Sequence, residues 1–319
     1  MRFIFNNMWE DKSSVIFYEK LISIMEDYMT KKPINILIDT DIGGDVDDAL
    51  ALALALNSPE LNIVGITTVY LANEWRANVT RNMLKVFGRE DIPVSTGAEK
   101  PLIGWWDESR IPNSSKDFGI LDGKPLPCAC DYIIQTVEKY ETLTIAAIGP
   151  LTNLALAIAK APYIVPKIKI IMMGGQITKA HPEWNIVCDP EAARIVFESG
   201  AEIVMTGLDV TNRCTFTRDD IEYVKNIGNE RTNLLGEMLD TFCEKFGFLP
   251  VLHDPLALSY LLWDDIMTFA DKKILVETAG DYSRGLTIDC DWGDGYPVKA
   301  AIDVKPEEFK KRLLDRIIQ

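Results

Sequence analysis

Long apolar runs are missing from this sequence, since no stretch reaches the roughly 18 consecutive apolar residues that a membrane-spanning helix needs. The N-terminal segment MRFIFNNMWEDKSS also lacks the long apolar core of a secretory signal, because Asn and acidic residues interrupt it. Cysteine is sparse, with 6 among 319 residues, and Cys128 and Cys130 form a C-x-C that is too short for the usual zinc spacing. We therefore expect free thiols, a reducing compartment and a cytoplasmic protein without a membrane partner.

Positive charge is also scarce, because 33 Lys and Arg stand against 48 Asp and Glu, for a net charge of −15. Such an acidic surface disfavours nucleic acid and anionic membranes as partners, but it tolerates cations and uncharged substrates. No P-loop and no G-x-G-x-x-G follows any expected strand, so the glycines do not indicate a nucleotide-phosphate site.

A repeated order of strand, loop and helix is present from Ile34 onward. INILID, NIVGITTVY and LTIAAIG are typical of buried strands, whereas DALALALALNS predicts a helix because Ala and Leu are helix formers. This alternation predicts one α/β domain over residues 34–319, with an open, mostly parallel sheet flanked by helices in a Rossmann-like core. Residues 1–33 are expected to be an N-terminal extension, with a helix at residues 13–29.

Ligand sites in such folds lie at the carboxyl ends of the strands. Four polar or glycine-rich junctions are expected there: DTDIGGDVDD, AIGPLTN, MMGGQ and GLDVTN, the last of which ends an expected strand, EIVMTGLDV. Residues 101–127, rich in Trp, Gly, Pro, Asp and Ser, are typical of a long functional loop. DPEAA instead predicts a helix start, with Asp189 as cap and Pro190 at the first position.

The first junction holds five aspartates within ten residues: Asp39, Asp41, Asp45, Asp47 and Asp48. A helix N-terminus typically stabilises each such charge by less than about 1 kcal/mol, which offsets little of their mutual repulsion. A hard divalent cation explains the cluster better, because such cations bind several carboxylate oxygens, and the neighbouring Gly-Gly lets the chain turn tightly. The alternative is a solvated helix start that Asp45 caps.

DTDIGGDVDDALAL resembles the signature of the nucleoside hydrolases, also called nucleoside N-ribohydrolases. Four further segments carry the resemblance in the same order: TTVYLANEWRANVTRN, IAAIGPLTNLALA, MMGGQ with EWNIVCDPEAA, and LHDPLALSYLL. The C-terminal VETAGDYSRGLTIDCDW and AAIDVKPEEF also match the family's ending, so that the resemblance covers residues 34–313. It implies an enzyme with an open α/β fold that hydrolyses the N-glycosidic bond of ribonucleosides to ribose and free base. Such an enzyme would act in nucleoside salvage.

The resemblance also implies one Ca²⁺ ion deep in the site. Its ligands would be the carboxylates of Asp41, Asp48 and Asp254 and the backbone carbonyl of Ile148, and Asp41 would be the base that activates water at the metal. His253 would lie near the leaving base as a second catalytic residue, which either protonates the base or only contacts the substrate. The residues expected to hold the ribose are Asp47, Asn73, Met173, Glu183 and Asn185. The expected partners are a small-molecule nucleoside and further copies of the chain, in a homodimer or homotetramer.

Three departures from the family pattern leave the preferred base open. The acidic motif is two residues longer, and we align Asp47 and Asp48 with the family's paired acids because DDAL continues identically, which leaves Asp45 without a role. The loop after Met173 is shorter and lacks an additional ribose-binding Asn. Residues 101–127 contain no histidine, although members that accept both purines and pyrimidines often carry one there.

The chemistry of the bond agrees with these residue types. Breaking the C–N bond builds an oxocarbenium-like sugar, so it needs a carboxylate to deprotonate water and oxygens around the ribose hydroxyls. The second histidine, His181, stands beside Pro182 and is expected to be structural or exposed. Trp105 and Trp106 could stack on a base or pack, whereas Trp184 is expected to pack beside the site.

Two other hypotheses remain open at this point. One is a Mg²⁺-dependent phosphohydrolase with Asp39 as the nucleophile of a D-x-D motif, although GLDVTN supplies only one of the further acids that such enzymes need. The other is a non-catalytic nucleoside- or sugar-binding member that keeps the metal site.

Overall fold

The computed structural model of this protein describes residues 32–104, 126–290 and 292–319. The helix expected at residues 13–29, and Trp105 and Trp106 with most of the expected loop, lie outside the described residues. In the part of the chain that is described, no helix combines the length and the apolar character that crossing a membrane requires.

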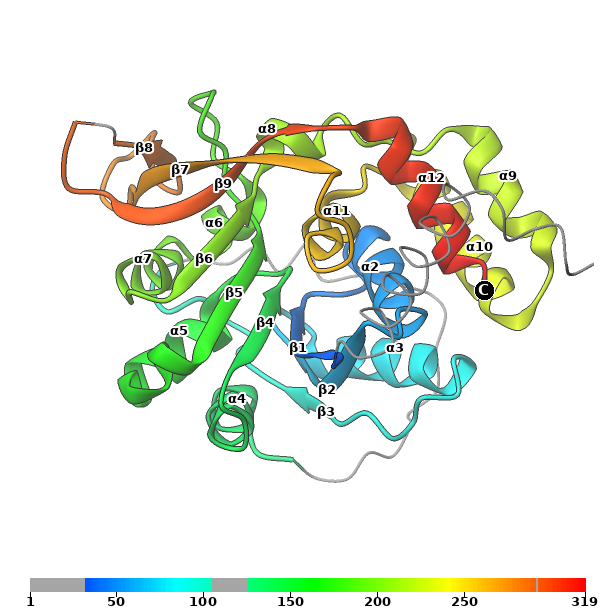
Figure 1. The fold of residues 1–319 in the computed structure, drawn as a ribbon, viewed down its shortest axis with the longest axis horizontal. Helices are drawn as coiled ribbons and strands as arrows, with labels where there is room; N and C mark the ends of the chain where they lie inside the picture. Colours follow the sequence, from blue (N-terminus) through cyan, green and yellow to red (C-terminus); the bar gives the residue numbers. More distant parts are fainter. Residues whose placement is uncertain (1–31, 105–125, 291) are drawn as a thin grey trace, which may run out of the picture. The chain divides into compact units, whose positions relative to one another are not determined.

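The strands of the described residues form one sheet. They are β1 (Ile34–Thr40), β2 (Leu61–Thr68), β3 (Val94–Thr96), β4 (Leu143–Ala147), β5 (Ile168–Met173), β6 (Glu202–Thr206), β7 (Met267–Val276), β8 (Thr287–Asp289) and β9 (Tyr296–Val304). Their order across the sheet is β3-β2-β1-β4-β5-β6-β9-β7-β8 (Figure 1). Pairing is parallel from β3 to β9, and β7 runs antiparallel to both β9 and β8. The mostly parallel sheet predicted from the strand–helix alternation is therefore confirmed.

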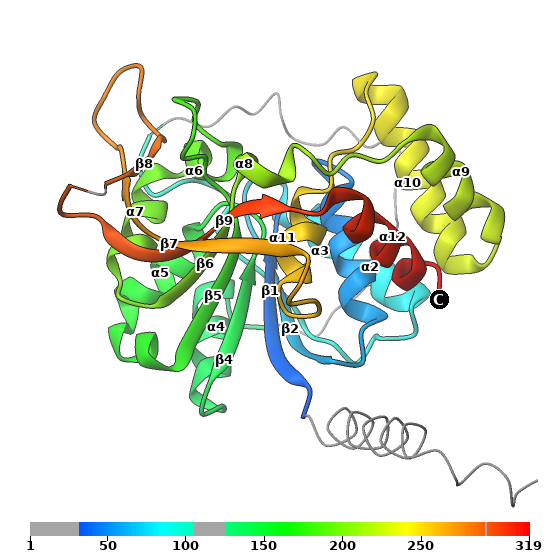
Figure 2. The ribbon, with the colours of Figure 1, turned by 45° about the horizontal axis from the view of Figure 1, so that its top comes forward.

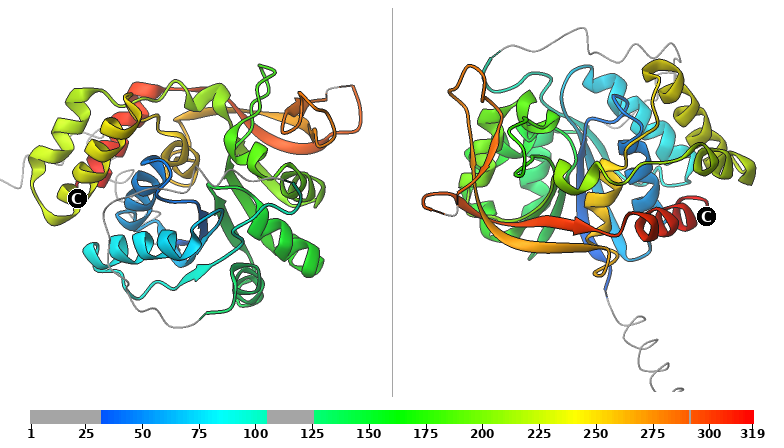
Figure 3. Two further views of the ribbon diagram at one scale, coloured as in Figure 1. Left: turned by 180° about the vertical axis from the view of Figure 1, so that it is seen from behind. Right: turned by 90° about the horizontal axis from the view of Figure 1, so that it is seen from above.

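Helices cover both faces of the sheet (Figures 1 and 3). One face carries α4 (Ala129–Glu138), α5 (Thr152–Lys160) and α7 (Pro190–Glu198), and the other carries α2 (Asp47–Leu56), α3 (Asn73–Val86) and α11 (His253–Ser259). Figure 2 shows α9 (Arg218–Ile227), α10 (Glu230–Phe246) and α12 (Pro306–Ile317) grouped beyond α2. The remaining short helices are η2 (Pro162–Lys167), α6 (Trp184–Cys188) and α8 (Leu208–Thr211).

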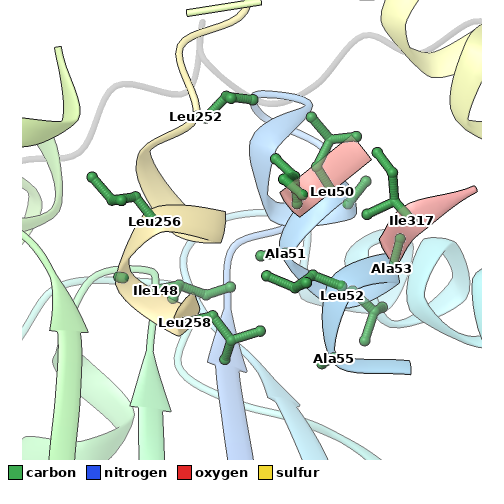
Figure 4. Packing of buried hydrophobic residues seen from close by; sticks show 14 of the residues in the cluster. Leu50, Ala51, Leu52, Ala53, Ala55, Ile148, Leu252, Leu256, Leu258 and Ile317 are labelled. Carbon is green, nitrogen blue, oxygen red and sulfur yellow. The ribbon is translucent and has the colours of Figure 1, made fainter. Parts of the chain in front are cut away.

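The Ala/Leu alternation after the acidic junction forms α2, as predicted from helix propensity. The helix is buried from Asp47 to Ala55, because the sheet lies on one side of it and other helices lie on the other. Figure 4 shows Leu50 and Leu52 of α2 in one cluster with Leu256 and Leu258 of α11. A helix that is apolar all round is a buried helix, which explains why α2 has no polar face.

Local signals in the sequence predict the start of α7 correctly and the end of β6 wrongly. Asp189 caps α7 by accepting from the N–H of Ala192 at 3.1 Å, with Pro190 at the first position, as predicted. The expected strand EIVMTGLDV is wrong in its last residues, since β6 stops at Thr206 and the chain turns into α8. Two sets of hydrogen bonds hold this turn: the N–H of Leu208 donates to the Gly175 carbonyl at 2.9 Å, and the Asp209 carboxylate accepts from backbone N–H groups after β5. Glycine fits at position 207, because a Cβ there would lie 2.5 Å from the Gly175 carbonyl oxygen.

Candidate active site

A cavity of about 860 Å³ opens at the carboxyl ends of the parallel strands. Asp41 follows β1, Ile148 follows β4 and Met173 ends β5, so parallel pairing brings these distant segments to one edge of the sheet. The N-terminal ends of α2, α6 and α11 contribute the rest of the wall. Every site residue predicted from the sequence lines this cavity except Asn73.

Three buried carboxylates meet in the cavity. Oxygens of Asp47, Asp48 and Asp254 lie within 4.8 Å of one another. The backbone N–H of Asp254 donates to Asp47 Oδ2 at 3.1 Å, and the hydroxyl of Thr40 donates to Asp48 Oδ1. Burial, together with repulsion between neighbouring aspartates, holds the pKa of each of the three well above its ordinary value. The cluster is therefore costly for the protein alone and favours a bound cation.

The donor set fits a hard divalent metal. All its donors are oxygens, which suits Ca²⁺ or Mg²⁺ and not a thiophilic metal. A divalent charge also reverses the penalty that raises these pKa values, because it stabilises the ionised carboxylates. The metal ion that the resemblance implies and the chemistry of these residues thus agree.

Asp41 stands on the wall of the same cavity, partly exposed, but outside the group of three. It lies against the β4–α5 turn, where a Cβ on Gly149 would come within 2.9 Å of Asp41 Oδ1. Burial raises the pKa of Asp41, and the nearby Arg76 guanidinium opposes that shift. The expected division of roles stays a prediction, with Asp41 on the metal and Asp47 on the sugar but able to approach the metal.

The predicted sugar residues of the β5–α6 region are tied to backbone groups. Glu183 caps α6 and accepts from the N–H groups of Gly175, Asn185 and Ile186 at 2.9–3.1 Å. Burial raises the pKa of Glu183 to about 7 in spite of these hydrogen bonds. The Asn185 amide donates to the carbonyls of Ile148 and Met173, both at 3.2 Å. Asn185 therefore fixes the carbonyl of Ile148, which was predicted as a metal ligand.

Asn73 is the predicted residue that the structure does not bring into the cavity wall. Its Nδ2 donates to the carbonyl of Gly97 at 2.9 Å, and its Oδ1 is buried without a hydrogen-bond partner among the described residues. Contact of Asn73 with ribose stays a prediction.

Both histidines line the cavity. His253 pairs through Nδ1 with the Thr211 hydroxyl at 2.7 Å, and burial lowers the pKa of His253 to about 4, so the ring is neutral at pH 7. Trp184 also lines the cavity and is 38% exposed, with its ring edge-on to that of Tyr70 at a centroid distance of 6.3 Å.

Sequence reasoning left some wall residues without a role. Asp45 lines the cavity and accepts from the N–H of Val46 at 2.5 Å, and burial raises the pKa of Asp45 to about 6. Tyr70 and Arg76 also line the cavity. Both stand in the family-like segment TTVYLANEWRANVTRN, but neither residue type at that spacing signals a site.

Asp39 does not line the cavity. It is fully buried, and its Oδ1 accepts from the Thr67 hydroxyl at 2.5 Å and from Asn153 Nδ2 at 2.8 Å. Burial raises the pKa of Asp39 to about 7. A phosphoryl-accepting nucleophile needs access to substrate, so this placement argues against the phosphohydrolase hypothesis.

The site and fold agree with the comparisons to known proteins. The family model described as inosine-uridine preferring nucleoside hydrolase matches residues 36–311. The chain therefore belongs to the nucleoside hydrolase family, a class of hydrolases that act on N-glycosyl compounds. It is 38% identical over 310 residues to the pyrimidine-specific ribonucleoside hydrolase RihA of Escherichia coli O9:H4, an alignment that covers 88% of this chain and 97% of the relative. The resemblance inferred from the motifs is confirmed.

Solved structures lead to the same family. The plant nucleoside hydrolase PpNRh1 aligns with a TM-score of 0.81 at 31% identity, over 90% of this chain and 99% of that one. The purine-preferring ribonucleoside hydrolase from Gardnerella vaginalis aligns with a TM-score of 0.79 at 28% identity, over 89% of this chain and 98% of that one.

Proposed function

We propose that this protein hydrolyses the N-glycosidic bond of ribonucleosides to ribose and free base, with a Ca²⁺ ion in its acidic cluster. The observation that carries the proposal is the convergence of three buried carboxylates in a cavity whose wall also holds Asp41. Asp48, Asp254 and Asp41, with the carbonyl of Ile148, would hold the ion, and Asp47 stands close enough to join them. When bound, the ion supplies positive charge that lowers the pKa of water and orients it.

Asp41 is the proposed general base. The family resemblance assigns this role to Asp41, which is partly exposed on the cavity wall and stands outside the group of three, as Asp45 also does, so it can reach a water molecule. Its carboxylate takes the proton of the attacking water as the new C–O bond forms at the anomeric carbon and the C–N bond breaks; the base leaves with the electron pair of that bond and takes up a proton from solvent.

The ribose end of the cavity is assigned to Asp47, Glu183, Asn185 and Met173. Acceptors on the hydroxyls gain strength as the sugar becomes positively charged, which is why carboxylate and amide oxygens suit this place. The backbone hydrogen bonds of Glu183 and Asn185 restrict their rotamers before substrate arrives, and such preorganisation favours catalysis.

The leaving base is assigned to the part of the cavity lined by His253, Tyr70 and Trp184. A His253 pKa of about 4 means that the ring contacts the base as neutral imidazole, and the Thr211 hydroxyl fixes its orientation through Nδ1. The aromatic rings offer faces and edges on which a planar base can pack.

A second candidate is a nucleoside-binding member without catalysis. The observation in its favour is that Asn73, for which the resemblance implies a ribose contact, donates to the Gly97 carbonyl and does not line the cavity. This candidate predicts Ca²⁺ and nucleoside binding with no release of ribose.

One assay separates these candidates. Purified protein is incubated with uridine, cytidine, inosine and guanosine, with Ca²⁺ or with chelator, and ribose is followed as reducing sugar. We expect release that stops with chelator and falls by at least about 100-fold in Asp41→Asn, the typical loss of a general base. Asp265→Asn, which changes an exposed aspartate paired with Arg312, is the matched control and should leave the rate unchanged. Binding without turnover on every nucleoside would support the second candidate and reject the first.

A further inference from the structure

Arg76 is an internal arginine in the wall of the cavity. Its side chain is fully buried, with a residue exposure of 1%. Nε donates to the carbonyls of Tyr70 at 2.6 Å and Leu71 at 2.9 Å, and Nη1 donates to the carbonyl of Ile42 at 2.9 Å. A buried guanidinium needs such partners, and here all three belong to the backbone of two loops that border the site.

The first of these loops is strained. Tyr70, Leu71 and Ala72 have φ of 63°, 39° and 50°, the left-handed region that non-glycine residues rarely adopt, and here three adopt it in succession. The N–H groups of Tyr70 and Leu71 donate to the carbonyls of Ala98 and Glu99, and the carbonyls of Tyr70 and Leu71 accept from the Arg76 guanidinium. Such a conformation persists only where its surroundings hold it from several sides.

The second loop is the acidic junction. Ile42 follows Asp41 directly, and Gly43 has φ of 98°. A Cβ on Gly43 would lie 2.3 Å from the ring of Trp75, so this ring rests on the glycine itself. Trp75 and Arg76 of α3 thus contact two neighbouring residues of the acidic junction, Gly43 and Ile42. Both lie beside the two residues by which this junction is longer than the family pattern.

We propose that Arg76 is a positioning residue that fixes the acidic junction and the 70–72 turn to one another. Its hydrogen bonds hold the carbonyls of Ile42, which directly follows Asp41, and of Tyr70 itself, and both Asp41 and Tyr70 line the cavity. Loss of this anchor would let the Asp41 carboxylate and the Tyr70 ring depart from the positions in which they meet the ion and the nucleoside. The inference rests on the proposed function for the identity of these ligands.

The charge of Arg76 could act by itself, because the guanidinium also favours the ionised forms of Asp41 and Asp48. A cation beside a metal site repels the metal, so a pure charge role predicts tighter Ca²⁺ binding when the charge is removed. A positioning role predicts weaker binding whether or not the charge remains. Arg76→Lys and Arg76→Met separate the two, because lysine keeps the charge but replaces the planar guanidinium, with its separate Nε and Nη1 donors, by one compact ammonium.

The test measures Ca²⁺ affinity of the full-length protein by isothermal titration calorimetry. We expect both Arg76→Lys and Arg76→Met to bind Ca²⁺ at least about tenfold more weakly, the usual effect of losing a residue that orients metal ligands. Wild-type affinity in Arg76→Lys, or tighter binding in Arg76→Met, would overturn the inference. Arg231→Lys is the matched control, because Arg231 also donates to backbone carbonyls, those of Gln319 and Phe87, and does not line the cavity.

A rescue variant separates positioning from general loss of stability. Ala72→Gly relieves the left-handed strain, because glycine adopts φ near +50° without cost. In the Arg76→Lys background we expect it to restore part of the Ca²⁺ affinity. Restored thermal stability with no gain in affinity would mean that Arg76 has only a structural role.

If the Arg76 variants do not fold, Trp75→Leu tests the inference instead, because it keeps Arg76 and removes the indole ring that rests on Gly43. We expect a smaller loss of Ca²⁺ affinity in the same direction, and unchanged affinity would count against the inference. The titration needs no turnover. Ca²⁺ binding by a wild-type protein that cleaves no nucleoside rejects only the proposed hydrolysis, whereas absence of Ca²⁺ binding rejects both.

Discussion

Asp254 and Asp47 are 207 positions apart in the chain, yet the backbone N–H of Asp254 donates to Asp47 Oδ2 at 3.1 Å. The contact joins the N-terminal turns of α11 and α2, which pack against each other in the core shown in Figure 4. The two helix starts present their acids to one point, where both helix dipoles favour negative charge. The acidic centre is therefore built by helix packing as much as by the acidic junction.

Calcium should stabilise the folded protein through this centre. We expect the melting temperature to rise with Ca²⁺, because a ligand at about 100 times its Kd adds about 2.7 kcal/mol to the free energy of unfolding. Asp48→Asn and Asp254→Asn should lose most of this shift, measured by differential scanning calorimetry with and without chelator. Asp303→Asn, which removes an exposed partner of Arg213, should keep it. An undiminished rise of the melting temperature with Ca²⁺ in Asp254→Asn would contradict the assignment of Asp254 as a Ca²⁺ ligand.

Without Ca²⁺, the same two variants should be more stable than the wild type. Burial, together with repulsion within the cluster, raises the pKa of Asp48 and Asp254, and replacing one carboxylate by an amide removes part of that repulsion at pH 7. Urea unfolding of chelated protein measures the change, and a loss of stability in both variants would show that the carboxylates are already neutralised by other means.

Glu183 should make stability depend on pH. Burial raises the pKa of Glu183 from 4.5 to about 7, so the folded state holds the proton more tightly than the unfolded state. Its contribution is fully present below about pH 4.5 and is lost as the pH rises through about 7. The free energy of unfolding of wild type minus that of Glu183→Gln should therefore fall between pH 4.5 and 7.5 in urea titrations. A constant difference over this range would contradict the raised pKa.

Trp184 should contribute to nucleoside binding. Its ring lines the cavity beside Tyr70, and packing of a base on an aromatic ring contributes about 1–3 kcal/mol. We expect Trp184→Ala to raise KM about tenfold, with a smaller change in kcat, in initial-rate assays on the best nucleoside of the panel. Trp292→Ala is the matched control, because Trp292 is 78% exposed and does not line the cavity. Equal effects of both variants would leave Trp184 without a role in binding.

The cysteines should differ in reactivity. Cys128 is exposed, Cys130 is partly exposed and the other four cysteines are buried. A thiol reagent should modify Cys128 first and Cys130 more slowly, because burial raises the pKa of the Cys130 thiol to about 11. Intact-mass spectrometry of native protein follows both steps, and Cys128→Ser should remove the fast one. Fast labelling of Cys214, whose pKa burial raises to about 12, would contradict the buried core.

Much of the fold was predictable because the signals are local. The Ala/Leu run gives α2 through helix propensity, and Asp189 followed by Pro190 starts α7 through a cap and a fixed φ. The end of the strand EIVMTGLDV was not predictable in this way. Gly207 lies against the carbonyl of Gly175, in the segment after β5. The end of β6 therefore depends on a neighbouring segment of the fold and not on the residues of the strand itself.

The sequence by itself determined the family, the strand–helix order and the residue types of the site, since these follow from motif identity and apolar periodicity. Tertiary structure decided which acids share one point, because Asp254 reaches Asp47 and Asp48 only when α11 packs on α2. It also decided the place of Arg76. Its proposed positioning role depends on hydrogen bonds to the carbonyls of Ile42 and Tyr70. Every residue has a backbone carbonyl, so the sequence does not indicate which ones accept from Arg76.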